Sequence, residues 1–191
     1  KLNRFVSLEV VSHKNGIADL FIGDLNKTHN QAKMKVSSYS EIKVEYSARG
    51  ILVSPGGQLE DRTLSSSLNS LWNALQGVKE GGVIGVIAEC SGGVGSEALR
   101  LAVSGRLNLK EVTSRKKYVY GLEELVYLNY VQKKFDMIMV STLPHYYVES
   151  ILGFKSANSV GDALSYILST SGSRSKFHVV PCASHTLLRT V

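Results

Sequence analysis

The sequence predicts an α/β protein with an open, mostly parallel sheet, helices on both faces and an N-terminal β-hairpin attached. Short apolar runs alternate along the chain with longer segments of helical periodicity. Strands that are apolar on both faces are typical of a parallel sheet covered by helices on either side. The chain has 191 residues, 43% of them hydrophobic and only 3 prolines, so one substantial core can form. We therefore expect a single α/β domain over residues 1–191.

The first elements predict a hairpin followed by a helix. Alternating runs flank the turn at 13–16, where Asn15 and Gly16 supply the positive φ values that a tight turn requires. Residues 25–38 have helical spacing, with Asn26 or Thr28 as the expected cap. One face of this helix carries three residues at related positions: His29, Ala32 and Val36.

A strand, a loop and the strongest helical signal come next. The apolar run 50–54 predicts a short strand that leads into a turn at 55–57. Large apolar residues then recur at helical spacing: Leu64, Leu68, Leu71, Leu75 and Val78. Asp61 lies where a carboxylate favours the helix dipole, and Gly81 and Gly82 are expected to end the helix.

The remaining sequence repeats this strand and helix alternation. We expect a strand at 83–89, a glycine-rich turn, helices at 96–104 and 122–133, a strand at 136–141, a helix at 159–170 and a strand at 177–181. Linker composition marks no second domain boundary.

Charge and apolar runs restrict the class of protein. The net charge of +6 favours an anionic small molecule or an acidic partner surface, and the basic residues are dispersed except at 110–117 and 133–134. No zinc knuckle, aromatic RNA-binding signature or helix-turn-helix is present, so nucleic acid is not an expected partner. The apolar runs are far shorter than the roughly 20 residues of a membrane span, and no signal peptide opens the chain. We expect a soluble cytoplasmic protein.

The two cysteines, Cys90 and Cys182, follow strand-like apolar runs. In a chain without a secretory signal, buried and reduced thiols are favoured over a disulfide.

Two loops have the composition of an anion site. The segments 54–63 and 90–97 each follow a predicted strand and open a predicted helix, which is where ligands bind in open α/β sheets. Both can cradle a carboxylate or phosphate, but Gly92, Gly93 and Gly95 match neither the dinucleotide fingerprint nor the P-loop. The alternative is that these glycines only form tight turns.

A polar stripe on the helix after the first loop gives further candidates. Ser66, Asn69 and Asn73 share one face, which is either solvated or part of a binding site. The adjacent Glu123 and Glu124 are expected to point to different sides of a helix as surface charges and not as an acid/base pair.

The five histidines have no metal-binding spacing, so no complete metal site is expected. His29 is interpreted either as a capping or core histidine or as a site or interface residue.

Six blocks in order resemble a known family. They are Gly23, Asp24 and His29; Gly56, Gly57 and Asp61; residues 80–90; residues 141–144; the segment around Asp162; and residues 179–181. Their order and spacing, from about Val6 to His185, resemble the C-terminal domain of the nickel-dependent lactate racemase family, which are nickel-pincer-nucleotide racemases and epimerases.

The resemblance implies a function for a longer protein. In that family a nickel-pincer nucleotide is held by a lysine and a histidine of the N-terminal domain, where two further histidines exchange the Cα proton. This chain is then the C-terminal domain of a two-domain 2-hydroxy-acid racemase or epimerase, inactive alone and forming one wall of the substrate cleft. It binds no cofactor by itself, and its expected partners are the N-terminal cofactor domain and a small hydroxy acid or polyol.

The resemblance also implies site residues. The family has a Gln-x-x-Lys pair on the helix after the Gly-Gly turn, and Ser66 and Asn69 stand at those positions here, while Val94 stands where many relatives have His. A substrate-pairing cation is thus replaced by a neutral amide, and Arg62 is a candidate to supply the positive charge. The expected substrate-binding residues are Gly56, Gly57, Asp61, Arg62, Ser66 and Asn69. The expected interdomain or anion-loop residues are His29, Ser91, Gly92, Gly93 and Gly95.

Two other functions stay open. One is a non-catalytic small-anion-binding or regulatory module that retains the fold, as the departures at Ser66 and Asn69 permit. The other is a stand-alone small-molecule transferase.

Overall fold

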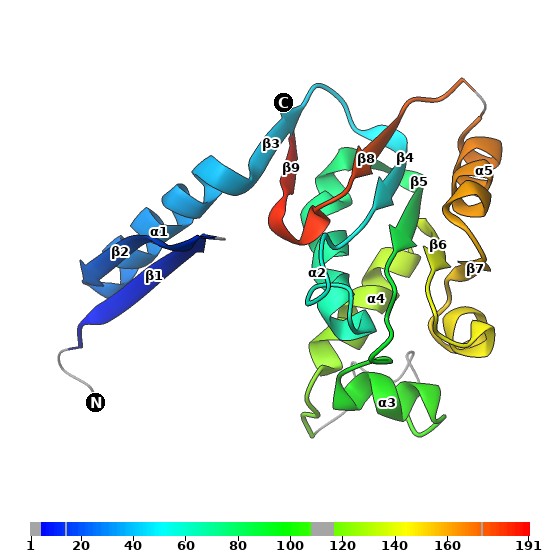
Figure 1. Cartoon of the computed structure of the whole chain (residues 1–191), viewed down its shortest axis with the longest axis horizontal. Helices are drawn as coiled ribbons and strands as arrows, with labels where there is room; N and C mark the ends of the chain where they lie inside the picture. The colour runs from blue at the N-terminus through cyan, green and yellow to red at the C-terminus, as the bar shows by residue number, and fades with distance from the viewer. Residues whose placement is uncertain (1–4, 14, 108–116, 173) are drawn as a thin grey trace. The chain divides into compact units, whose positions relative to one another are not determined.

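The computed structural model describes residues 5–13, 15–107, 117–172 and 174–191 (Figure 1). The chain divides into two compact units, Lys1–Ile42 and Lys43–Val191. No helix within the described ranges is long and apolar enough to cross a membrane.

The first unit is a hairpin with one helix. Strands β1 (Ser7–His13) and β2 (Gly16–Gly23) are antiparallel, which confirms the predicted hairpin, and a register shift lies at Val11 and Ser12. Helix α1 (Leu25–Ser40) follows, and Thr28 and Ala32 on it are buried.

The cap of α1 and its buried face differ from the prediction. Asp24 has an extended backbone and caps the helix, since its side chain accepts hydrogen bonds from the N–H groups of Asn26 and Lys27. The two expected caps, Asn26 and Thr28, already lie inside the helix. The buried pair Thr28 and Ala32 also replaces the expected face, since His29 and Val36 are exposed.

The outer face of the hairpin is apolar and exposed. The cross-strand neighbours Leu8 and Ile22 are 59% and 65% exposed, and the next pair, Val10 and Leu20, is 50% and 46% exposed. Within its own unit, this face of the two-stranded sheet is therefore left uncovered.

The second unit is built on five parallel strands. They are β4 (Ala48–Val53), β5 (Val78–Ile87), β6 (Asp136–Val140), β7 (Lys155–Ala157) and β8 (Phe177–Val180), in the order β7-β6-β5-β4-β8. The chain steps outward from β4 to β7 and returns to place β8 on the other side of β4. The sheet is therefore open and parallel, as predicted, and its order reverses between β4 and β8, where ligands commonly bind in such folds.

Helices cover both faces of this sheet, as predicted (Figure 1). On one face α5 (Val160–Ser171) packs Ala163 and Ile167 against a cluster that includes Leu52 and Ile138. The other face carries the larger core, which includes Leu71 of α2 (Leu64–Ala74) and Leu128 of α4 (Leu122–Gln132). Helix α3 (Glu97–Val103) contacts α4 and adds Leu99 to that core.

Helix α2 ends earlier in the sequence than predicted. The helix stops at Ala74, a 3-10 turn covers Leu75–Gly77, and Val78 begins β5 opposite Ala48. A Cβ at Gly77 would lie 2.5 Å from a Leu188 methyl, so close packing with the C-terminal segment sets this position, which helical periodicity does not reveal.

Several short elements had no sequence prediction. They are β3 (Glu41–Val44), β7, a π-helical turn (Tyr147–Ile151), a 3-10 turn (Ala183–His185) and β9 (Leu187–Thr190). Runs of three to five residues are too short for periodicity to identify, so their pairing in space decides them.

Candidate functional site

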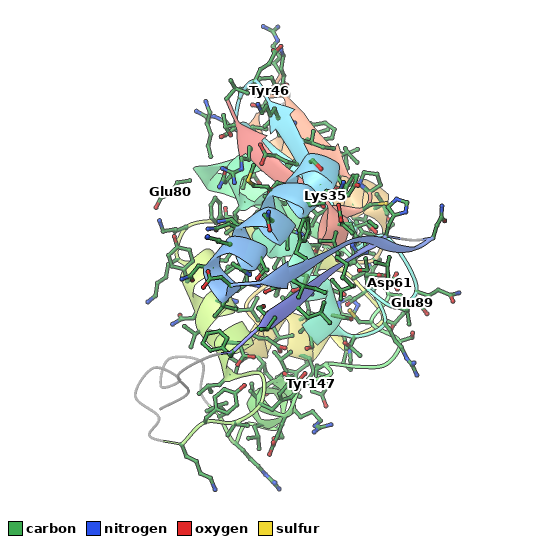
Figure 2. The ribbon with its side chains drawn as sticks, turned by 90° about the vertical axis from the view of Figure 1, so that its left-hand side faces the viewer. Lys35, Tyr46, Asp61, Glu80, Glu89 and Tyr147 are labelled. Carbon is green, nitrogen blue, oxygen red and sulfur yellow. The ribbon has the colours of Figure 1, made fainter. Side chains whose placement is uncertain are left out.

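The two predicted loops lie at the carboxyl ends of β4 and β5 and are joined by backbone hydrogen bonds. The N–H of Cys90 donates to the carbonyl of Asp61 (2.8 Å), and the N–H of Gly92 donates to the carbonyl of Arg62 (2.7 Å). Figure 2 labels Asp61 on the first loop and Glu89, the residue before the second. The loops therefore support each other as one structure.

The start of α2 is closed by the second loop. The N–H of Leu64 donates to Gly93 O (3.0 Å), that of Ser65 donates to Val94 O (3.1 Å), and that of Ser66 donates to the Thr63 hydroxyl (3.2 Å). These are the amides that a helix N-terminus would offer to an anion. Because each has a partner within the chain, this end of α2 has no free donor among them.

A surface pocket of about 580 Å³ opens beside α2. Its described lining comes from α2 and its cap, from the residues before α3, and from the start of α4. The lining residues are Thr63, Ser65, Ser66, Leu68, Asn69, Trp72, Gly95, Ser96, Tyr120, Glu123 and Glu124.

The Glu124 carboxylate holds the three segments of the pocket together. Ser65 on α2 donates its hydroxyl hydrogen to Oε1 (2.5 Å), and Ser96, the cap of α3, donates to Oε2 (2.6 Å). Hydrogen bonds to an ionised acceptor are short and strong. One side chain on α4 thus fixes the positions of α2 and the α3 cap.

Glu123, which was expected to point to a different side of the helix as a surface charge, also belongs to the described lining of this pocket. Both glutamates occupy the first turn of α4. Their partners differ, because Glu123 accepts one hydrogen bond from the exposed Tyr118 hydroxyl (3.1 Å).

Two exposed aromatic rings complete the pocket. Trp72 is 52% exposed and stacks on Tyr127 with an angle of 9° between the ring planes. Tyr120 is 65% exposed. Tyr127 is itself buried, which raises the pKa of its hydroxyl, so Trp72 rests on a packed ring and presents its remaining surface outward.

The predicted polar stripe on α2 divides between two places. Ser66 and Asn69 line the pocket together with Gly95, whereas Asn73 donates two hydrogen bonds, to Ala183 O and Ser184 O (both 2.9 Å). Ser66 also belongs to the helix capping box with Thr63. Trp72, Tyr120 and Glu124 were not predicted as site residues. Of these three, only Trp72 could have been predicted from the sequence, because it follows Asn69 by three residues on the same helix.

The other predicted loop residues lie outside this pocket lining: Gly56, Gly57, Asp61, Arg62, Ser91, Gly92 and Gly93. Gly56 has φ +112°, and a Cβ there would lie 2.8 Å from the Cα of Cys182, so it allows the ends of β4 and β8 to approach closely. The Arg62 side chain is exposed.

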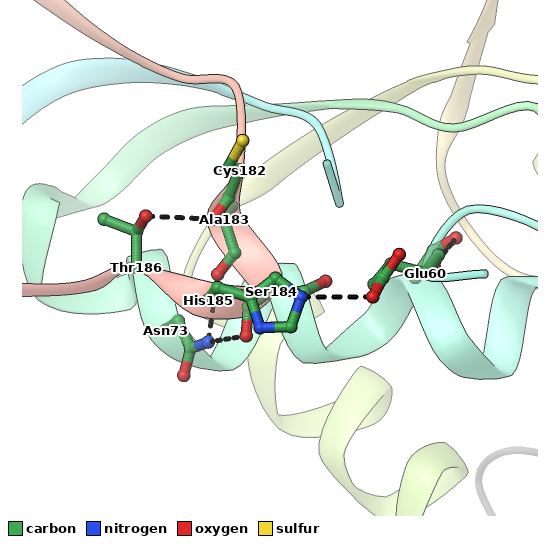
Figure 3. A network of polar contacts seen from close by, with 8 residues as sticks. Glu60, Asn73, Cys182, Ala183, Ser184, His185 and Thr186 are labelled. Carbon is green, nitrogen blue, oxygen red and sulfur yellow. Dashed lines mark hydrogen bonds and ion pairs between the residues drawn. The ribbon is translucent and has the colours of Figure 1, made fainter. Parts of the chain in front are cut away.

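A polar network joins the C-terminal segment to the first loop and α2 (Figure 3). His185 Nε2 lies 3.1 Å from Glu60 Oε1, and this contact lowers the pKa of Glu60. Asn73 binds the same segment, and Thr186 donates its hydroxyl to Cys182 O (2.9 Å). The network secures the chain after β8 against the loop after β4.

Both cysteines are free, but only one is buried. Cys90 has φ +55°, and burial raises the pKa of its thiol to about 11. Cys182 is exposed because it lies in the turn after β8, which contradicts the expected burial.

His29 belongs to the first unit and is neither buried nor a cap. Its side chain is 65% exposed and lies 3.6 Å from Glu9. Within the described ranges, no group of three or more His, Cys, Asp or Glu residues could hold a metal ion. The predicted basic run at 110–117 lies outside the described residues except for Lys117.

The fold is similar to that of a solved racemase. The chain matches the lactate racemase apoprotein from Thermoanaerobacterium thermosaccharolyticum with a TM-score of 0.82 and 24% sequence identity, over 96% of this chain. It spans only 46% of that protein, which is consistent with the predicted resemblance to a C-terminal domain of lactate racemases. No protein-family model and no curated protein matches the sequence. The chain therefore has the fold of about half of a lactate racemase.

Proposed function

We propose that this chain is the substrate-side domain of a two-domain racemase or epimerase that inverts a hydroxyl-bearing carbon in a small hydroxy acid or polyol. The observation that carries the proposal is the fold likeness, which covers almost all of this chain but less than half of a lactate racemase. Ser66 and Asn69, the positions expected to contact substrate, both line the pocket beside α2.

The role assigned to these residues is binding and orientation. Asn69 is exposed and offers both an amide donor and a carbonyl acceptor to a substrate hydroxyl. A nickel-pincer nucleotide would supply transient hydride acceptance. In keeping with the resemblance, we assign the cofactor to the partner domain and no catalytic step to this chain.

The hairpin supports the existence of a partner domain. Leu8, Val10, Leu20 and Ile22 form paired, exposed apolar side chains on one sheet face. Contiguous exposed apolar surface is a common mark of an interaction site. A domain that packs on this face would remove it from water.

A binding module without catalysis is the second candidate. Every described residue that lines the pocket belongs to the unit Lys43–Val191, so this unit offers a ligand surface of its own. This candidate predicts saturable binding with no change in the stereochemistry of the ligand.

The test uses the full-length natural protein and the variant Asn69→Ala. If the proposal is right, kcat/KM for stereochemical inversion falls about tenfold, the loss expected for one or two hydrogen bonds to substrate. Asn158→Ala is the control, because Asn158 is exposed in the turn before α5 and outside the pocket lining. Equal activity of the two variants would contradict the substrate role of Asn69. Binding without inversion would favour the non-catalytic module.

A further inference from the structure

We infer that the pocket beside α2 takes a neutral polyhydroxylated ligand, a sugar or sugar alcohol, and disfavours a carboxylate. This inference rests on the proposed function, because it names the substrate class of the same site. It is carried by four features of the lining: two carboxylates, two exposed aromatic rings, an exposed amide and several hydroxyls.

The carboxylates set the electrostatics of the pocket. Glu123 and Glu124 lie side by side in sequence and both line it, and the described lining residues include no Lys, Arg or His. An anionic ligand would meet two like charges in a partly enclosed space, where charges interact more strongly than in bulk water. Donor-rich ligands are therefore favoured over carboxylates.

The polar groups are arranged to accept hydrogen bonds. The hydroxyl hydrogen of Ser65 is directed to Glu124, so the Ser65 oxygen keeps lone pairs for ligand hydroxyls. Ser66 donates its hydroxyl hydrogen to Thr63 O and accepts the Thr63 N–H, which leaves its oxygen one further lone pair. Glu123 accepts only the Tyr118 hydrogen bond among its described contacts, which leaves acceptor capacity. Asn69 adds a donor. A polyol, which both donates and accepts at each hydroxyl, matches this pattern.

The aromatic rings offer an apolar surface of matching shape. Trp72 is held by its stacking on Tyr127 and remains half exposed, and Tyr120 is exposed on a separate segment. The face of an aromatic ring carries partial negative charge and attracts C–H groups with partial positive charge. The C–H faces of a sugar or extended polyol meet this requirement, while their hydroxyls reach the polar lining.

The experiment measures ligand binding to the full-length protein with two probes that share a carbon chain. Sorbitol and gluconate differ mainly at one terminal carbon, which is an alcohol in the first and a carboxylate in the second. Trp72 is the only tryptophan of this chain, so the emission change lost in Trp72→Phe reports its own contact with ligand. We expect saturable binding of sorbitol at least about tenfold tighter than gluconate, the effect of an ion repelled by like charge.

Three variants sharpen the result. Glu123→Gln should strengthen gluconate binding severalfold while sorbitol binding changes little, and Asn69→Ala should weaken sorbitol binding about tenfold. Tyr146→Ala is the matched control, because Tyr146 is as exposed as the pocket residue Tyr120 but lies outside the pocket lining. Its binding constants should equal those of the natural protein.

Three outcomes would overturn the inference. The first is gluconate or lactate binding as tightly as sorbitol at Trp72, and the second is the absence of sorbitol binding. The third is tighter binding of choline, a cationic probe, which would reassign the pocket to a cation. Inversion of hydroxy acids without sorbitol binding would refute the ligand class and leave the proposed function intact. Sorbitol binding in a protein that inverts no substrate would support the ligand class and refute the proposed function.

Discussion

Removing the Glu124 carboxylate should destabilise the second unit far more than removing its neighbour Glu123. Glu124→Ala deletes hydrogen bonds of 2.5 and 2.6 Å to Ser65 and Ser96. Each such bond to a charged acceptor contributes about 1.5 kcal/mol, so the expected loss is about 3 kcal/mol. Ser96 is only 2% exposed, so its hydroxyl would also lose a partner that water cannot easily replace.

Glu123→Ala is the matched control for this prediction. Both glutamates lie in the first turn of α4, so both variants lose the same favourable interaction with the helix dipole. Glu123 has a single exposed hydrogen bond, to Tyr118, whose loss should cost no more than about 0.5 kcal/mol. The difference between the two variants is therefore about 2.5 kcal/mol.

Urea unfolding followed by Trp72 fluorescence measures this difference. With a typical slope near 2 kcal/mol per molar urea, the midpoint of Glu124→Ala should fall about 1 M below that of Glu123→Ala. Midpoints that agree within about 0.2 M would refute the assignment of Glu124 as the residue that joins the three pocket segments.

Three further predictions concern the loops and the C-terminal segment. A thiol reagent should modify only Cys182 in the folded protein and both cysteines in denaturant, because Cys90 is buried and burial raises its pKa to about 11; two fast-reacting native thiols would contradict this. Glu60→Gln should cause a small loss of stability at pH values above 4.5. The difference in stability from the natural protein should vanish as pH falls through the lowered pKa of Glu60, and thermal melts between pH 3 and 7 measure it. Gly56→Ala should lower the free energy of unfolding in urea by at least about 2 kcal/mol, because the added Cβ would clash with the backbone of Cys182. Gly81→Ala, where φ is +77° but the space is open, should lower it by about 1 kcal/mol.

The sequence was sufficient for the main architecture because the central strands are short and almost wholly apolar. Runs such as 83–87 and 137–140 are buried on both faces, so their pattern predicts a covered parallel sheet. Positions set by tertiary contact were predicted less well. The end of α2 depends on the approach of Leu188 to Gly77, which lies more than a hundred residues earlier in the chain.

The candidate site shows the same division. Ser66 and Asn69 could be predicted because they share one helix face and because the resemblance pointed to them. Glu124 could not be, since its role depends on hydroxyl groups 28 and 59 residues away in sequence. The glycine-rich loops were read as an anion cradle, yet Gly93 and Val94 use their carbonyls to bind the amides of α2.

The central claim, that this chain forms the substrate side of a racemase or epimerase, is tested most directly by incubating the full-length natural protein with single enantiomers or epimers. The panel contains small hydroxy acids and polyols, and chiral chromatography follows the product. The account predicts conversion of at least one compound toward its equilibrium mixture, with a rate about tenfold lower in Asn69→Ala than in Asn158→Ala. Unchanged stereochemistry across the whole panel, in protein that binds the same compounds, would contradict it.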